Sequence, residues 1–393
     1  HRVLSGPLVV PPDPVNHAQE VLAESAHKSS IYQTIASNLG SCRSASNYSF
    51  MEYRTYPKTD LTVSTVGFGL WTTATDWWGK MSDAEAVALL HEALDAGVTL
   101  FDAADTYGNG RSEEQLALAF GHRRDKVVYA TKFGYDFYNY GDERKGQREI
   151  PADFSPAFVR FALEQSLRRL QTDVIDVYQI HNAHLDQIQS DELFELLENF
   201  RAEGKIRYYG VALGPAIGWL VEGVDAARVR NVTSIQMIWN ILEQFPGNEM
   251  LAAAREIGAD TGYMVRVPHS SGMLEGKYTP ETIFPPGDHR RHRPKSWLVN
   301  GIKKIESLRF LETPERTLGQ AAIQWLLNEP RVMTVLPNIY NREQLLEFAN
   351  APHAPVLSND ELLVIAQLTK INFGVDEPPG NFKGTMAREH VGV

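Results

Sequence analysis

Cysteine is almost absent from this chain of 393 residues, since Cys42 is the only one. A single thiol excludes an intramolecular disulfide and a metal site built from several cysteine ligands. No other cluster in the sequence predicts a metal site. Any redox chemistry must therefore come from a bound cofactor.

Long apolar runs and an excess of basic residues are also missing. No stretch approaches the roughly 18–20 apolar residues that cross a bilayer, and none near residue 1 resembles the apolar core of a signal peptide. The net charge is −11, and an acidic surface does not suit the phosphate backbone of a nucleic acid. We therefore expect a cytoplasmic protein that binds neither membranes nor nucleic acids.

Residues 1–50 lack both methionine and the regular alternation of strands and helices that follows. One amphipathic helix could form within EVLAESAHKSSIYQTIASNL. We expect this segment to be a non-native or disordered extension, with the folded unit beginning near Met51. A docking arm or a lid is the alternative.

From Met51 onward, short apolar runs alternate with longer segments of helical period, which indicates repeated βα units around a parallel sheet. We predict a single α/β domain over 51–393, a (β/α)8 TIM barrel with an N-terminal hairpin at 53–63 and a C-terminal tail. The strands are expected near 66–71, 98–103, 127–132, 174–180, 206–212, 234–239, 262–267 and 332–336. The clearest helices are expected at 83–97, 111–120, 156–170, 191–203 and 317–328. Long loops at 134–155 and 268–316 follow the third and seventh barrel strands, where such loops usually shape an active site.

Four polar residues fall at the ends of neighbouring strands: Asp102 and Tyr107 after VTLF, Lys132 after VVYAT, and His181 after VIDVYQI. The carboxyl ends of parallel barrel strands meet at one rim, so these side chains should lie together. An ammonium group favours ionisation of a neighbouring phenol, and a carboxylate can hold that ammonium in place. We predict that Tyr107 protonates a carbonyl group as it receives a hydride, that Lys132 and Asp102 assist, and that His181 orients the carbonyl.

These residues allow two other interpretations. Asp102 and Lys132 could form a plain salt bridge while His181 is a core histidine, but four such residues in register at a barrel rim favour a site. Lys132 could instead form a Schiff base with a sugar, although Tyr107 and His181 would then lack a shared purpose.

The glycine fingerprint of a Rossmann dinucleotide site is missing, because GNGRSEE carries Glu113 where the third glycine should stand. A nicotinamide cofactor would therefore lie across the barrel mouth, with its phosphates near the loops after the last two strands. The residues that suit this task are Ser270, Ser271, Gly272 and Lys277. The basic run DHRRHRPK is either a solvated loop or a phosphate contact.

Several longer motifs resemble the aldo-keto reductases, in particular their longer, bacterial-type members. They are FDAADTYGNGRSEE, VVYATKFG, SLRRLQTDVIDVYQIH, EGKIRYYGV, SGMLEGKY and QAAIQWLL, and the similarity runs from about Met51 to residue 370. The resemblance implies a (β/α)8 barrel, NADPH-dependent reduction of a carbonyl, and a catalytic group formed by Asp102, Tyr107, Lys132 and His181.

The resemblance also implies residues that hold the cofactor. Gln236 matches a glutamine that binds the nicotinamide carboxamide, and Arg266 stands where an aromatic ring usually stacks on the nicotinamide, a task that a guanidinium plane can perform. The segment LPNIYNREQLLEF resembles the one that grips the adenosine phosphate, with the matched positions Asn338, Asn341, Gln344 and Glu347.

Two departures from the family pattern affect this cofactor site. Ala212-Leu213 replace a Ser-Asn pair that contacts the carboxamide, and no basic residue stands at Asn338 or Tyr340. Since a 2′-phosphate is normally met by Lys or Arg, we expect NADPH with NADH as the alternative, and Arg342 or the basic residues of 288–295 could compensate.

Aromatic residues crowd the loops after the first and third strands, and a pocket lined in this way would accept an apolar or aromatic carbonyl compound. We predict substrate contacts from Trp71, Trp78 and Tyr135, although any of these rings could simply pack the loops against the barrel. The substrate is expected to be an aldehyde or ketone, with sugar-derived compounds included. The altered Ala212-Leu213 pair motivates a second function, a nucleotide-binding sensor or assembly subunit with little turnover. The sequence leaves the exact substrate, the direction of the reaction and the oligomeric state open.

Overall fold

The structure is a computed structural model that describes residues 51–141, 150–214 and 219–377. The expectation for residues 1–50 lies outside this part of the chain, as do residues 142–149 of the first long loop and the tail beyond residue 377.

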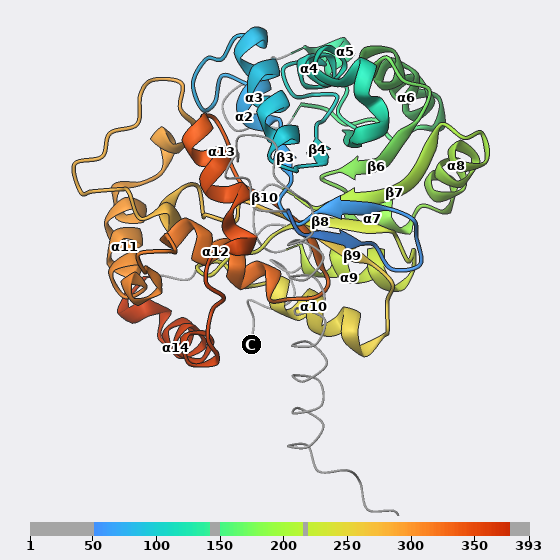
Figure 1. Cartoon of the computed structure of the whole chain (residues 1–393). Helices are drawn as coiled ribbons and strands as arrows, with labels where there is room; N and C mark the ends of the chain where they lie inside the picture. The colour runs from blue at the N-terminus through green and yellow to red at the C-terminus, as the bar shows by residue number, and fades with distance from the viewer. Residues whose placement is uncertain (1–50, 142–149, 215–218, 378–393) are drawn as a thin grey trace, which may run out of the picture. The chain divides into compact units, whose positions relative to one another are not determined.

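Eight parallel strands form the centre of the fold, in the order β10-β9-β8-β7-β6-β5-β4-β3 (Figure 1). They are β3 (Phe68–Gly69), β4 (Leu100–Asp102), β5 (Val128–Phe133), β6 (Ile175–His181), β7 (Ile206–Ala212), β8 (Ser234–Ile238), β9 (Gly262–Arg266) and β10 (Val332–Leu336). A parallel bridge between Val66 and Val335 joins the first and last strands, and the Gly67 amide donates to the Val335 carbonyl at 2.9 Å. The predicted (β/α)8 barrel is therefore confirmed, with each strand close to its predicted position.

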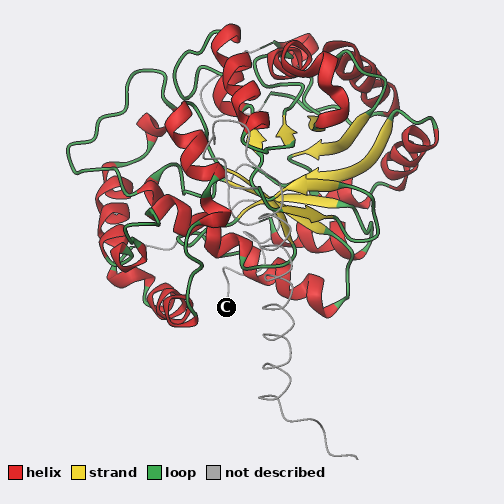
Figure 2. Ribbon diagram, viewed as in Figure 1, coloured by secondary structure: helices red, strands yellow, loops and turns green. Residues whose placement is uncertain are grey.

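Helices surround the strands (Figure 2). The longer ones are α3 (Asp83–Asp95), α4 (Arg111–Phe120), α6 (Pro156–Leu170), α8 (Asp191–Ala202), α9 (Leu220–Arg228), α10 (Gly247–Glu256), α11 (Lys295–Glu306), α12 (Leu318–Leu327), α13 (Arg342–Ala349) and α14 (Asn359–Lys370). Short helices α2 (Trp71–Ala74), α5 (Phe137–Tyr140) and α7 (Leu185–Gln189) lie in the loops. The five helices predicted from the sequence are all present.

Local chemistry explains where these helices begin and end. Ser82 and Glu85 form a capping box at the start of α3, and Thr317 and Gln320 form another at the start of α12. Gly97 follows the end of α3 with a positive φ of 91°, a conformation that favours glycine.

The barrel interior is layered. The N-terminal hairpin of β1 (Tyr53–Thr55) and β2 (Thr62–Ser64) contributes Tyr56 and Leu61 to a buried apolar cluster that includes Leu100, Val177 and Met264. Successive inward positions on a strand are two residues apart, so Leu100 precedes Asp102 and Ala130 precedes Lys132 on the same face. The polar residues of the strand ends therefore rest on an apolar layer.

One element differs from the sequence-based expectation. The segment 268–316 was predicted as a long loop, but it contains helix α11. Leu298, Gly301 and Ile305 form the buried face of this helix, and Gly301 lies so close to Met273 that an added Cβ would be 2.3 Å from its methyl carbon. The long connection itself is as predicted, but the surrounding prolines and charged residues mask the short apolar period of the helix within it.

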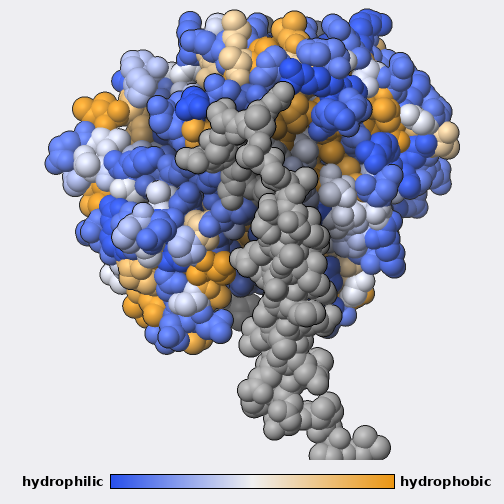
Figure 3. All heavy atoms as spheres, in the orientation of Figure 1, coloured by the Kyte–Doolittle hydropathy of each residue, from blue (hydrophilic) through white to orange (hydrophobic). Residues whose placement is uncertain are grey.

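None of the helices within the described ranges is long and apolar enough to cross a membrane. On the face drawn in Figure 3, most of the visible surface is hydrophilic and the apolar patches are small and separated.

Glu113 stands where a Rossmann motif would have its third glycine, and its side chain links α4, β5 and α6. Its carboxylate lies in α4, is fully buried, accepts a hydrogen bond from Thr131 of β5 at 2.6 Å and pairs with Arg169 of α6 at 2.7 Å. The charge of Glu113 also adds to the effect of burial on Asp105, whose pKa is raised well above its usual value.

We predict that Glu113→Ala lowers the free energy of unfolding by about 3–5 kcal/mol, because it leaves the Arg169 guanidinium buried without its partner. Urea unfolding followed by circular dichroism measures this change. The matched control is Glu203→Ala, which removes surface ion pairs with Arg160 and Lys205 and should hardly move the unfolding midpoint. Equal midpoints for both variants would contradict the bracing role.

Candidate active site

A buried ion pair lies at the carboxyl ends of β4 and β5. The Lys132 ammonium contacts the Oδ2 atom of Asp102 at 2.7 Å and the Ala103 carbonyl oxygen at 2.7 Å. The side chains of Lys132 and Asp102 are only 1% and 5% exposed. Two charges at this depth are stable only with further hydrogen bonds around them.

Two amide side chains provide those hydrogen bonds. Gln179 of β6 and Gln236 of β8 donate to the Oδ1 atom of Asp102 at 3.1 and 3.0 Å. Gln236 was predicted as a cofactor residue, and the structure also places it against this carboxylate. Gln179 was not predicted, although a glutamine two residues before His181 on a buried strand shares its face, which was a usable signal.

Tyr107 lies over the ion pair. The Lys132 ammonium is 4.8 Å from the centre of the Tyr107 ring, and the ring of His181 is 5.8 Å away in an edge-to-face arrangement. The chain turns sharply after Tyr107, where Gly108 has a φ of 60° and an added Cβ would be 2.4 Å from the Ala74 carbonyl oxygen. The structure therefore brings Asp102, Tyr107, Lys132 and His181 together, as predicted.

Aromatic side chains stand beside these residues. Trp71 contacts Tyr107 edge to face, with ring centres 5.1 Å apart, and Tyr135 lies 5.0 Å from His181. Asn182, in the left-handed conformation with a φ of 50°, donates to the Tyr135 hydroxyl at 2.6 Å. Trp71 and Tyr135 thus lie beside Tyr107 and His181, and their contact with substrate stays a prediction.

Arg266 ends β9 and is the next polar residue around the rim. Its Nη2 atom donates to the Leu213 carbonyl at 2.9 Å and to the Gly214 carbonyl, while its buried Nε atom has no hydrogen-bond partner within the described ranges. Burial lowers the pKa of this guanidinium, and the nearby Tyr107 and Asp102 act in the opposite direction. Arg266 therefore reaches into the region where Ala212-Leu213 supply no polar side chain.

The loop after β9 has an unusual backbone. Ser270, Ser271 and Gly272 have positive φ values of 47°, 58° and 89° in succession. Consecutive residues with left-handed geometry can turn their amide groups toward one side and form a concavity that suits an anion. Tyr278 holds this turn by donating to the Ser271 carbonyl at 2.7 Å.

The predicted adenosine residues lie around the start of α13, just beyond this loop. Asn341 caps the helix, and its side chain accepts from the Gln344 amide at 2.8 Å. The Gln344 side chain donates to Glu275 at 3.1 Å. Glu347 accepts from Thr317 at 2.7 Å and from Lys277 at 3.2 Å. Asn338 lies in the segment between β10 and α13 and is partly exposed.

The basic run 288–295 crosses toward the loop after β3. Arg290 pairs with Asp288 at 2.5 Å, donates to Tyr278 at 2.8 Å and lies 4.3 Å over the Trp78 ring. His289 packs 4.5 Å from the Trp78 ring, and burial lowers its pKa to about 4. Trp78 thus joins two loops, and its contact with substrate stays a prediction.

Arg342, considered above as a phosphate ligand, pairs with Glu92 of α3 at 2.9 Å. The described residues contain no group of three His, Cys, Asp or Glu that could hold a metal ion.

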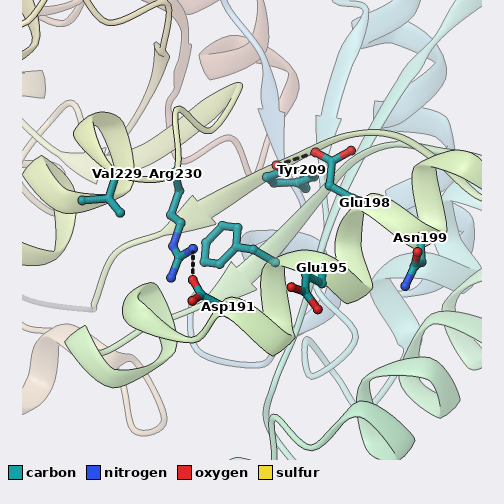
Figure 4. A pocket seen from close by; sticks show the side chains of 8 residues that line it. Asp191, Glu195, Glu198, Asn199, Tyr209, Val229 and Arg230 are labelled. Atoms are coloured by element: carbon teal, nitrogen blue, oxygen red, sulfur yellow. Dashed lines mark hydrogen bonds and ion pairs between the residues drawn. The ribbon is translucent and has the colours of Figure 1, made fainter.

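A separate hollow of about 560 Å³ lies on the outside of the barrel, between α8, β7 and the loop after α9 (Figure 4). Arg230 pairs with Asp191 at 2.6 Å, and Tyr209 donates to Glu198 at 2.7 Å. The principal polar groups of this hollow are thus bonded to one another, so the hollow gives no evidence of a ligand site.

Comparisons with known proteins agree with this arrangement. The sequence profile of the Aldo/keto reductase family matches residues 65–370. The uncharacterized oxidoreductase YqkF of Bacillus subtilis is 30% identical over 81% of this chain and 97% of its own length. The NADH-specific methylglyoxal reductase of Escherichia coli is 28% identical over 74% of this chain and 90% of its own.

A solved structure shares the fold. The holo form of the aldo-keto reductase AKR11C1 from Bacillus halodurans has a TM-score of 0.64 and 29% identity, covering 81% of this chain and 96% of that one. The family match spans the whole barrel, from the first strand to α14, and includes every residue of the candidate site. The chain belongs to the aldo/keto reductase family.

Proposed function

We propose that this protein reduces an aldehyde or ketone to an alcohol with a hydride from a reduced nicotinamide nucleotide, and that Tyr107 delivers the proton. The observation that carries the proposal is the buried Asp102–Lys132 pair beneath the Tyr107 ring. Buried ion pairs contribute little net stability compared with apolar residues of the same size. The proposed proton transfer from Tyr107 gives the Asp102–Lys132 pair a role that stability alone does not.

Each residue of the group has a distinct role. His181 donates a hydrogen bond to the substrate carbonyl oxygen and fixes its orientation. Tyr107 protonates the same oxygen as negative charge develops on it, a step worth about 10²–10⁴-fold in rate. The Lys132 ammonium stabilises the phenolate that remains, and Asp102 holds the ammonium in place.

The residues around the rim fit a nicotinamide nucleotide, which supplies the hydride when bound. Gln236 and the unpartnered Nε atom of Arg266 would hold the nicotinamide end. The left-handed turn of Ser270, Ser271 and Gly272 would hold the phosphates, as loops after the seventh and eighth strands often do in such barrels. Asn338, Asn341, Gln344, Glu347 and Lys277 would surround the adenosine.

The walls of the site favour a small carbonyl compound with an apolar or aromatic part. Trp71 packs against Tyr107, and Tyr135 packs against His181. The name of the methylglyoxal reductase relative is consistent with a small aldehyde.

A second candidate function is nucleotide binding with little turnover, as a sensor or an assembly subunit. The observation that favours it is that Ala212 and Leu213 are buried apolar residues beside the Arg266 guanidinium, so the expected polar clamp is altered.

The two functions are separated by the oxidation of reduced nucleotide in the presence of a panel of aldehydes. We expect Tyr107→Phe to lower kcat by about 10²–10⁴-fold, because the general acid is removed. Tyr53→Phe changes an exposed phenol on the hairpin and should behave as the wild type. Equal, slow rates in the wild type and Tyr107→Phe would contradict catalysis and support the sensor.

The aromatic wall gives a further prediction. Trp71→Ala should raise KM for aromatic aldehydes by about tenfold, since the apolar contact with the substrate is lost. A small aliphatic aldehyde should show a much smaller change. The comparison is made by steady-state kinetics with Phe310→Ala, a partly exposed aromatic residue outside the site, as the control. An equal KM change for both aldehydes would argue that Trp71 only packs the loop.

A further inference from the structure

The loop after β9 runs outward from the candidate active site in a defined order. Arg266 lies at the strand end, the left-handed turn 270–272 follows, and the short 3-10 helix Met273–Glu275 leads to Lys277. An extended dinucleotide with its nicotinamide near Tyr107 and its phosphates at the turn would place its adenosine ribose near Glu275 and the start of α13. The selectivity between nucleotides that we infer below depends on this placement and therefore on the proposed function.

Two carboxylates flank the ammonium of Lys277 at that end of the loop. Lys277 contacts Glu347 at 3.2 Å and Glu275 at 3.8 Å, so one ammonium is shared by two carboxylates. The side chains of Glu275 and Glu347 are 7% and 15% exposed, while that of Lys277 is 60% exposed. Water therefore screens the cation more than the two anions.

The pKa of Lys277 responds to these two carboxylates. Partial burial acts to lower its pKa, but the carboxylates of Glu347 and Glu275 outweigh that effect and raise the pKa above its usual value. The Lys277 ammonium is thus already paired with the carboxylates of Glu347 and Glu275.

Other basic residues near this region are also engaged. Arg342, at the start of α13, pairs with Glu92 of α3. Arg290 forms its ion pair with Asp288 and bonds to Tyr278. Arg309 donates to the Gly276 carbonyl at 3.0 Å and to Glu312 at 2.9 Å.

Gln344 occupies a central place in this group. It is buried in the first turn of α13, and its side-chain amide donates to Glu275 at 3.1 Å. A 2′-phosphate monoester is normally met by Arg or Lys, whereas a ribose hydroxyl can donate a hydrogen bond to a carboxylate. We infer that Glu275, Glu347 and Gln344 make this protein select NADH over NADPH, opposite to the preference expected from the family resemblance.

The test is the direct binding of NADH and of NADPH to the full chain, measured by isothermal titration calorimetry without substrate. We expect NADH to bind at least about tenfold more tightly than NADPH at low salt, with a smaller ratio at high salt because like-charge repulsion is screened. Gln344→Arg should lower the NADH-to-NADPH ratio of binding constants by about tenfold, because it adds a guanidinium that can pair with the 2′-phosphate.

Variants that neutralise one carboxylate at a time test the role of the two glutamates. Glu275→Gln and Glu347→Gln should each narrow the NADH-to-NADPH ratio, while Glu195→Gln on the exposed face of α8 changes the net charge equally and should leave the ratio intact. Thermal unfolding of each variant confirms that it is folded.

Two results would overturn the inference alone: NADPH binding as tightly as NADH in the wild type, or an unchanged ratio in both glutamine variants. Binding of neither nucleotide would overturn the proposed function itself, and this inference with it.

Discussion

The buried ion pair between Lys132 and Asp102 is the interaction on which the rest of the site depends. Four barrel strands contribute to it, because the carboxylate also receives amide hydrogen bonds from Gln179 and Gln236. Such a pair is costly to desolvate, and the surrounding donors and the Ala103 carbonyl offset that cost. The closed sheet is what brings these groups within hydrogen-bond distance.

The layers of the barrel give the pair its environment. Below it, the hairpin and the strand interiors supply apolar side chains that exclude water. Above it, a glycine turn places Tyr107 over the ammonium, and Trp71 and His181 pack against the phenol ring. A low-dielectric floor strengthens the electrostatic influence of Lys132 on any charge that develops at the tyrosine oxygen. The contacts that pack the barrel around Asp102, Lys132 and Tyr107 are thus the same contacts that position these residues for the proposed reaction.

Much of the architecture could be predicted from the sequence, because buried parallel strands read as apolar runs and their polar end residues mark the rim. Helix α11 was masked by the prolines and charges around it. Gln179 was missed although its position two residues before His181, on the same face of a buried strand, marked it. The partners of Trp78 could not be predicted either, since they come from two loops far apart in sequence. Likewise, the carboxylates around Lys277 become neighbours only when α13 packs beside the loop after β9.

The most direct test of this account compares the single variant Lys132→Met with the double variant Asp102→Asn/Lys132→Met. Replacing both charges with neutral groups of similar volume removes the unpaired carboxylate that the single variant leaves buried. The account predicts that the double variant regains the thermal stability lost in Lys132→Met while its kcat for aldehyde reduction stays at least about 10²-fold below that of the wild type. A double variant that is stable and turns over at the wild-type rate would contradict it.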